Sequence, residues 1–284
     1  MYTSLPQILI PVDFSEQSLI ALEQSFNLAK FYNAELTLLY VIAEGNITHG
    51  NSADDGMIKA KLEGLAATIS KKGRINVNTL VEKGSVSDKI LEVSTHLKTR
   101  MIIMGTTGGQ TQKKGLVGSN ALKVVEGARC PVVTIKGKSM RDGCKNIVLP
   151  IDLTKESLQK AKKAIELGKL YGATIRLVSV LFGQDKTMEN RLNRKIEEAT
   201  FLIKSEVPCT SEIIKAKVDD SLASIVVDYA NKVQADLIMI MTQQEEESKI
   251  LPIDSNSAAH YIICNSDVPV MSIVPTIKLH HVIE

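Results

Sequence analysis

The stretch ILIPVDFSEQSLIAL, residues 8–22, returns as IVLPIDLTKESLQKA at residues 147–161. In this alignment Pro11 and Asp13 fall on Pro150 and Asp152, 139 residues further along the chain. An internal repeat decides the fold before any single element does, because each copy must form the same unit of structure. The sequence therefore predicts two related halves.

Two further blocks repeat at nearly the same spacing. AELTLLYV from residue 34 returns as ATIRLVSV from residue 173, and CPVVTI from residue 130 matches VPVMSI from residue 268. The segment between the two copies, KGKSMRDGCKN at residues 136–146, is polar and contains glycine, as expected of a connection between domains. We place the boundary near residue 142, which gives domains at residues 1–141 and 142–284.

Within each half, the hydrophobic periodicity alternates between that of a strand and that of a helix. ILIPV is a short continuous apolar run, as expected of a parallel strand buried on both faces. Ser15 can then cap a helix. The helix has apolar residues at steps of three and four, as has its copy: Leu19, Leu22, Phe26 and Ala29, then Leu158, Ala161, Ile165 and Gly168.

The rest of the first half continues this alternation. Ser85 and Asp88 form a possible capping box ahead of the stripe Val86, Ile90, Val93 and Leu97. Other strands are expected at residues 35–42, 75–84, 100–105 and 131–135, and other helices at 63–73 and 119–128. Strands that alternate with helices form a parallel sheet covered on both faces. Each half is thus predicted to be a compact, Rossmann-like α/β domain.

Composition excludes several classes of protein. The 284 residues are 44% apolar and 23% charged, with a net charge of +2 and no tryptophan, so neither a basic surface nor aromatic stacking favours nucleic-acid binding. No apolar run approaches the ~18–20 residues of a membrane span, and no secretory signal is recognisable, so we expect a cytoplasmic protein. The cysteines form no C-x-x-C pair and predict neither a disulfide framework nor a zinc site: Cys130, Cys144, Cys209 and Cys264.

The loop after the fourth strand of the first half, GTTGGQTQKKGLVGSN at residues 105–120, is rich in glycine. Gly105 directly follows a strand, where a missing side chain permits positive φ and close approach of a ligand. Gly118 and Ser119 begin the next helix, where free N–H groups favour an anion. Neither a Walker A motif nor G-x-G-x-x-G is present. The spacing therefore leaves two interpretations open, a phosphate-binding loop and a flexible surface loop.

With these motifs in view, the sequence resembles the universal stress protein (UspA) family. The resemblance rests on the strand end IPVDFSEQS and on the spacing G-x2-G-x9-G-[ST], matched by Gly105, Gly108, Gly118 and Ser119. It covers essentially the whole chain. It implies that each domain has a five-stranded parallel sheet in the order 3-2-1-4-5, of the adenine nucleotide alpha hydrolase-like type. It also implies that the fifth strands of the two domains lie side by side, as in a dimer made covalent.

The resemblance further implies a site for ATP, with Mg²⁺ as its possible companion, across strands one, two and four. The matching positions are Pro11, Asp13, Val41, Gly105, Gly108, Gly118, Ser119 and Asn120. Asp13 would contact adenine or ribose, and Val41 would supply an apolar wall for the base. Asp13 could instead only cap a helix, and Val41 could belong to the core. Lys113 and Lys114 could meet the γ-phosphate or be solvated.

The second half lacks the glycine loop. Counting from its fourth strand places Met241, Gln244 and Asp254 at the three glycine positions, whereas counting back from Pro269 places Asn256 and Ser257 opposite Gly118 and Ser119. The acidic run at residues 245–247 would repel phosphate. Asp152 and Val180 are retained. The second domain is therefore expected to keep the fold without binding ATP in the same manner.

Three functions are compatible with these observations. The first is a cytoplasmic stress-response protein whose first domain binds ATP and which acts, through a protein partner that the sequence does not name, as a nucleotide-dependent regulator. The second is a slow ATP hydrolase or nucleotidyl-transferring enzyme that uses Lys113 or Lys114, although no catalytic or metal-binding set of residues is recognisable. The third is a scaffold that binds no nucleotide. A further homodimer is compatible with all three.

Overall fold

The computed structural model describes residues 5–43, 52–106, 118–136, 143–154, 157–242 and 255–275. Strands and helices alternate in both halves, as predicted from the periodicity. The first half contains β1 (Gln7–Pro11), α1 (Glu16–Phe31), β2 (Glu35–Ile42), α2 (Ser52–Gly73), β3 (Val77–Lys83), α3 (Val86–His96), β4 (Met101–Gly105), α4 (Ser119–Gly127) and β5 (Val132–Ile135). The second half contains β6 (Asn146–Pro150), α5 (Ser157–Tyr171), β7 (Thr174–Phe182), α6 (Lys186–Lys204), β8 (Cys209–Ala216), α7 (Leu222–Lys232), β9 (Leu237–Met241), α8 (Ser255–Asn265) and β10 (Val270–Ile273).

The strands form one ten-stranded sheet in the order β3-β2-β1-β4-β5-β10-β9-β6-β7-β8. Each half therefore has the order 3-2-1-4-5 with parallel neighbours, and this prediction is confirmed. β5 and β10 pair in antiparallel fashion at the centre, with Met271 opposite Val133. The fifth strands thus lie side by side, which covers two sheet edges that would otherwise be exposed.

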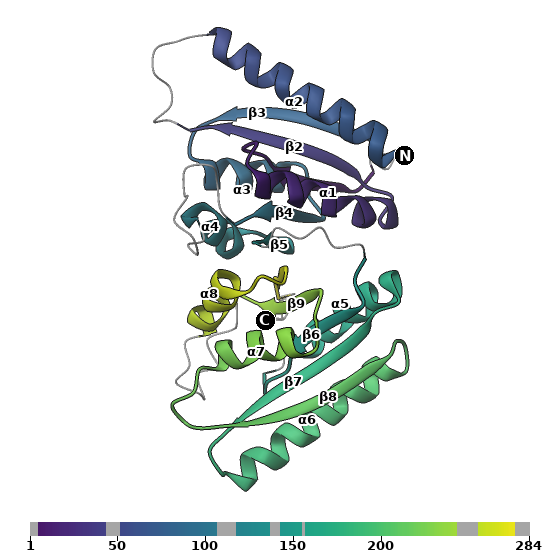
Figure 1. Cartoon of the computed structure of the whole chain (residues 1–284), viewed down its shortest axis with the longest axis vertical. Helices are drawn as coiled ribbons and strands as arrows, with labels where there is room; N and C mark the ends of the chain where they lie inside the picture. The colour runs from purple at the N-terminus through teal and green to yellow at the C-terminus, as the bar shows by residue number, and fades with distance from the viewer. Residues whose placement is uncertain are drawn as a thin grey trace, which may run out of the picture.

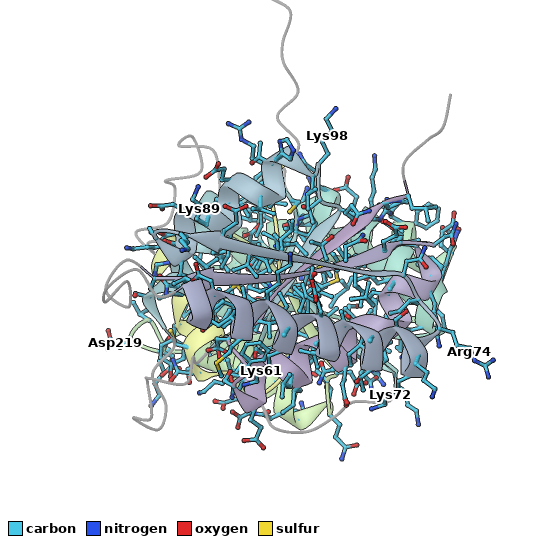
Figure 2. All side chains as sticks on the ribbon, turned by 90° about the horizontal axis from the view of Figure 1, so that it is seen from above. Lys61, Lys72, Arg74, Lys89, Lys98 and Asp219 are labelled. Carbon is cyan, nitrogen blue, oxygen red and sulfur yellow. The ribbon has the colours of Figure 1, made fainter. Side chains whose placement is uncertain are left out.

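Helices cover both faces of this sheet. One buried cluster packs α1, α2, α5 and α6 against one face, and a second packs α3, α4, α7 and α8 against the other. Figure 1 shows α2 and α6 at opposite ends of the elongated molecule, with α4 facing α8 near its middle. Figure 2, turned by 90°, places Lys61 and Lys72 of α2 on one side of the sheet and Lys89 of α3 on the other.

The N-terminal cap predicted for α1 is present, whereas the capping box predicted for α3 is not. The Ser15 hydroxyl accepts a hydrogen bond from Ser18 N and caps α1, as predicted. Ser85 occupies the N-cap position of α3, but its side chain makes no capping hydrogen bond, so the expected capping box is wrong. The stripe of α3 is nevertheless directed inward, with Ile90 and Val93 buried, because apolar burial rather than the cap orients the helix.

Charged side chains also join the two halves beside the central strands. An Arg100 guanidinium nitrogen lies 2.7 Å from Glu166 Oε1 of α5, and the guanidinium carbon lies 3.8 Å from the Tyr32 ring centroid. Lys163 makes a second ion pair with Glu166, at 2.7 Å. Among the residues described above, no helix is long and apolar enough to cross a membrane.

Candidate functional site

The carboxyl ends of β1, β2 and β4 meet at one edge of the first half of the sheet. β1 lies between β2 and β4 and pairs with both in parallel, so the chain winds in opposite directions from this point. In sheets of this type, ligands bind where the winding reverses. The structure brings the ends of these strands together with the start of α4, through a hydrogen bond of 2.7 Å from Gly118 N to Thr106 O.

Asp13 lies in the turn that joins β1 to α1. Its side chain is exposed, and its Oδ1 accepts a hydrogen bond of 3.0 Å from Ser15 N. Because Ser15 is the N-cap of α1, Asp13 orders the turn ahead of the helix rather than capping the helix itself. The exposed carboxylate retains acceptor capacity toward a ligand at the rim of the sheet.

The residue after Asp13 has an unusual backbone conformation. Phe14 has φ of 60°, in the left-handed region, which costs about 1 kcal/mol or more for a residue with a bulky side chain. Its ring lies 5.3 Å from the Tyr40 ring centroid, and the Lys61 ammonium lies 4.0 Å from the Phe14 ring centroid. These contacts hold the strained turn in place. The corresponding Leu153 is not among the described residues with positive φ.

Gly105 ends β4, and packing explains why it is glycine. A Cβ at this position would lie 3.0 Å from the carbonyl carbon and 3.0 Å from Cβ of Gln17, in the first turn of α1. The expected positive φ is absent, because Gly105 is not among the described glycines with that conformation. The missing side chain therefore lets α1 approach β4 closely.

Gly118 differs, because packing does not require a glycine there. It is the N-cap of α4 with φ of −64°, and among the described residues a Cβ would approach no atom more closely than Thr106 O, at 3.4 Å. Ser119 and Asn120 follow as exposed residues of the first turn, where backbone N–H groups lack helical acceptors. Among the described residues, a group placed at Gly118, at the positive end of α4, would thus meet no steric clash. Gly108, Lys113 and Lys114 lie outside the described residues.

Pro11 and Val41 complete the predicted set. Pro11 is half-buried at the end of β1, and Val41 is half-buried near the end of β2, where it packs against the cluster beneath α3 and α4. Val41 therefore belongs to the edge of the core and also presents part of its surface at the rim. The interpretation of Val41 as a core residue and its interpretation as an apolar wall for a base are therefore compatible.

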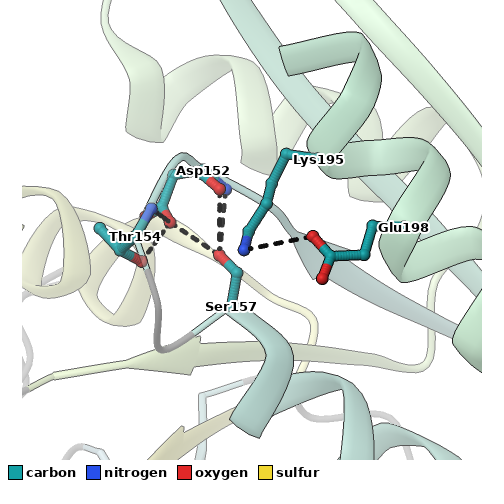
Figure 3. A network of polar contacts seen from close by, with 5 residues as sticks. All are labelled: Asp152, Thr154, Ser157, Lys195 and Glu198. Carbon is teal, nitrogen blue, oxygen red and sulfur yellow. Dashed lines mark hydrogen bonds and ion pairs between the residues drawn. The ribbon is translucent and has the colours of Figure 1, made fainter. Parts of the chain in front are cut away.

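In the second domain the corresponding aspartate is enclosed by its own chain. Asp152 Oδ1 accepts hydrogen bonds of 3.0 Å from Thr154 N and 2.7 Å from Ser157 Oγ, with the Thr154 hydroxyl as a further partner. Lys160 is only 4% exposed, and its ammonium donates to Pro150 O at 2.8 Å. Figure 3 shows the polar contacts of Asp152 with Thr154 and Ser157.

These partners change the ionisation of Asp152. Burial alone would raise the pKa of the carboxyl, but the Lys160 ammonium and the hydrogen bonds outweigh it, so this pKa lies below its ordinary value. Lys195 of α6, whose side chain is 17% exposed, instead pairs with Glu198 at 3.6 Å. Figure 3 shows its ammonium directed into the space between Ser157 and Glu198.

Sequence reasoning missed both lysines. Lys160 occupies the α5 position that corresponds to Ala21 of α1, which is fully buried. A lysine at a buried position of a repeated helix was the available signal, because a buried cation requires a partner. Met241, opposite Gly105, is 5% exposed. Gln244, residues 245–247 and Asp254 lie outside the described part of the chain, as do the side chains of Asn256 and Ser257.

Comparison with known proteins supplies the relationships of the chain. The family described as the Universal stress protein family matches residues 5–136 and again residues 143–273. Universal stress protein MJ0531 of Methanocaldococcus jannaschii is 29% identical over 141 residues, which is 46% of this chain and 81% of that protein. Universal stress protein Sll1654 of Synechocystis sp. is 27% identical over 133 residues, which is 45% of this chain and 83% of that protein.

A solved structure matches both halves together. The crystal structure of a universal stress protein from Archaeoglobus fulgidus has a TM-score of 0.74 and 19% identity to this chain, and covers 96% of this chain and 99% of its own. At this identity the likeness shows the fold. Within the described residues, no group of His, Cys, Asp and Glu side chains has the arrangement of a metal site.

Proposed function

The chain belongs to the Universal stress protein family, and from that premise we propose that its first domain binds ATP and acts as a nucleotide-dependent regulator. We place its two domains at residues 1–141 and 142–284, the boundaries that the repeat predicts. The observation that carries the proposal is the space at Gly118, at the positive end of α4, on the same edge of the sheet as the exposed carboxylate of Asp13.

The chemistry of the two positions suits the two ends of a nucleotide. Asp13 can accept hydrogen bonds from ribose hydroxyls or from the adenine amino group, whereas a carboxylate beside the phosphates would be unfavourable. The first turn of α4 offers backbone N–H groups and the positive end of the helix dipole to phosphate oxygens. Ser119 and Asn120 add hydrogen-bonding side chains there. Mg²⁺, where required, would enter with the phosphates.

The aspartate of the second domain has different surroundings. Asp152 is engaged by Thr154, Ser157 and Lys160. A ligand that needed this carboxylate would have to break those contacts, and the loss of buried hydrogen bonds is costly. We therefore expect one ATP per chain, measured by isothermal titration of ATP into the purified protein.

Variants at Gly118 test the site without disturbing the fold. Aspartate is a favoured N-cap residue, so Gly118→Asp should leave α4 intact while its charge repels phosphate, and ATP affinity should fall at least about tenfold. Gly118→Asn is the matched control, since asparagine has nearly the same shape, caps equally well and carries no charge. Asn should lower the affinity much less than Asp.

Other outcomes would favour the other functions. A titration that shows no binding, together with no nucleotide in protein purified under native conditions, would favour a nucleotide-free scaffold. Two ATP molecules per chain would contradict the assignment to the first domain. Phosphate release that disappears in Lys113→Ala/Lys114→Ala would favour an ATP hydrolase.

A further inference from the structure

Helix α8 of the second domain lies against elements of the first domain that carry the proposed nucleotide site. Figure 1 shows α4 and α8 facing each other at the middle of the molecule. His260 Nε2 of α8 lies 2.8 Å from Glu126 Oε1 of α4. Glu126 is in the last turn of the helix whose first turn contains Ser119 and Asn120. One rigid element therefore connects the proposed phosphate end of the site with the second domain.

A second link runs through Lys136, the residue directly after β5. Its ammonium donates a hydrogen bond of 2.7 Å to the carbonyl oxygen of Cys264, in the last turn of α8. Carbonyl groups in the last turn of a helix lack helical donors, and a cation there is favoured by the helix dipole. Lys136 thus binds the end of α8 at a position where an ammonium group is well suited.

Lys136 also contacts the site itself through its backbone. The Gln17 side-chain amide donates a hydrogen bond to Lys136 O, and the backbone of Gln17 is packed against Gly105. The Gln17 Oε1 atom is buried, and no hydrogen-bond partner for it is found among the described residues. A buried acceptor without a donor is unfavourable. Small shifts of the first turn of α1 should therefore change the free energy of the buried Gln17 side chain.

The two links have no counterparts in which the domains exchange roles. The strand-five alignment places Val274 opposite Lys136, and valine has no donor that could reach the carboxyl end of α4. The same alignment places Leu122 opposite His260 and Cys264 opposite Glu126, so the Glu126–His260 contact has no counterpart either. A symmetric pair of domains would contain each contact twice. Here the Glu126–His260 and Lys136–Cys264 contacts both join the first domain to α8, separately from the Arg100–Glu166 ion pair with α5.

We propose that Lys136, assisted by the Glu126–His260 pair, couples nucleotide occupancy of the first domain to the stability of α8, which makes α8 the output element of the second domain. This inference rests on the proposed function. ATP that orders the start of α4 and the turn around Gly105 also orders the contacts of Gln17 and Glu126. Those contacts hold α8, so local opening of α8 becomes rarer when nucleotide is bound.

Hydrogen exchange of the intact chain, measured by mass spectrometry with and without saturating ATP, tests the coupling. Amides of residues 255–265 are expected to exchange at least about threefold more slowly with ATP in the wild type. Lys136→Met, which keeps the length and apolar part of the side chain, should abolish that difference. Lys30→Met is the matched control, because Lys30 is exposed on α1 and should leave the difference unchanged.

A second variant covers the case in which Lys136→Met fails to fold. Glu126→Gln removes the charge of a residue whose side chain is 52% exposed, and it should reduce the ATP-dependent protection of α8 without unfolding the chain. Coupling is reciprocal, so the form of the wild type in which α8 is open should bind ATP more weakly by the factor by which ATP slows α8 exchange.

Isothermal titration on the same samples separates the two proposals. Binding of ATP without any change in α8 exchange, or equal α8 protection in the wild type and both variants, would overturn the coupling and leave the proposed function standing. Absence of binding would overturn both. ATP-dependent protection of α8 that is lost in Lys136→Met and kept in Lys30→Met would support the coupling.

Discussion

Two aspartates occupy the same strand end in the two halves of this molecule, and their surroundings differ. Asp13 is exposed and accepts a hydrogen bond from Ser15 N, whereas Asp152 is enclosed by hydroxyl groups and by the buried ammonium of Lys160. The same position of a duplicated fold can therefore be exposed at the rim of the sheet in one copy and enclosed in the other. In the second copy, hydroxyl groups and a buried ammonium of the same chain surround the carboxylate.

The largest expected effect concerns Asp152. Asp152→Asn keeps the shape of the side chain but leaves Lys160, which is 4% exposed, without its carboxylate, so the free energy of unfolding should fall by about 3 kcal/mol. Asp13→Asn is the matched control, and we expect it to change stability little while weakening ATP binding. Urea unfolding of both variants measures the difference, and equal losses of stability would contradict the comparison.

The fold was predictable because it is encoded in local patterns. Repeated blocks such as residues 8–22 and 147–161 fix the period of strands and helices, and burial of ILIPV on both faces follows from its composition. The strand order came from the resemblance to the family. Pairing of β5 with β10 followed from the same source, and in each case the structure agrees.

The partners of Asp152 were not predictable in this way. Lys160 is eight residues further along the chain, and a lysine in a helix normally faces water. Its burial depends on how α5 packs over the end of β6, which spacing does not reveal. The packing of Gly105 was not predictable for the same reason, because its closest neighbour is the backbone of Gln17 in another element. Contacts between elements decide both positions.

Gly105 and Gly118 are expected to give the next largest contrast in stability. Gly105→Ala would push a Cβ to 3.0 Å from the backbone carbon of Gln17, so α1 must shift, at a cost of about 1–3 kcal/mol. Gly118→Ala meets its nearest described atom, Thr106 O, at 3.4 Å, so the loss should be limited to the poorer N-cap preference of alanine, at most about 1 kcal/mol. Thermal unfolding without nucleotide distinguishes the two. A larger loss for Gly118→Ala would show that packing, and not a ligand, explains that glycine.

The smallest effect is a dependence on pH that should be confined to acid. Because the folded-state pKa of Asp152 lies below its ordinary value, the stability that its carboxylate contributes is complete above about pH 4, the unfolded pKa, and is lost as the pH falls through the folded pKa. A protonated Asp152 can still form hydrogen bonds with Thr154 and Ser157. Acid should therefore remove only part of the difference in stability between wild type and Asp152→Asn. In urea unfolding, the gap between wild type and Asp152→Asn should stay constant from pH 7 to about pH 5 and narrow below that. If the difference in unfolding free energy instead widened in acid, Lys160 would not stabilise the charged form of Asp152. The proposal that partners within the second domain hold this carboxylate would then have to be rejected.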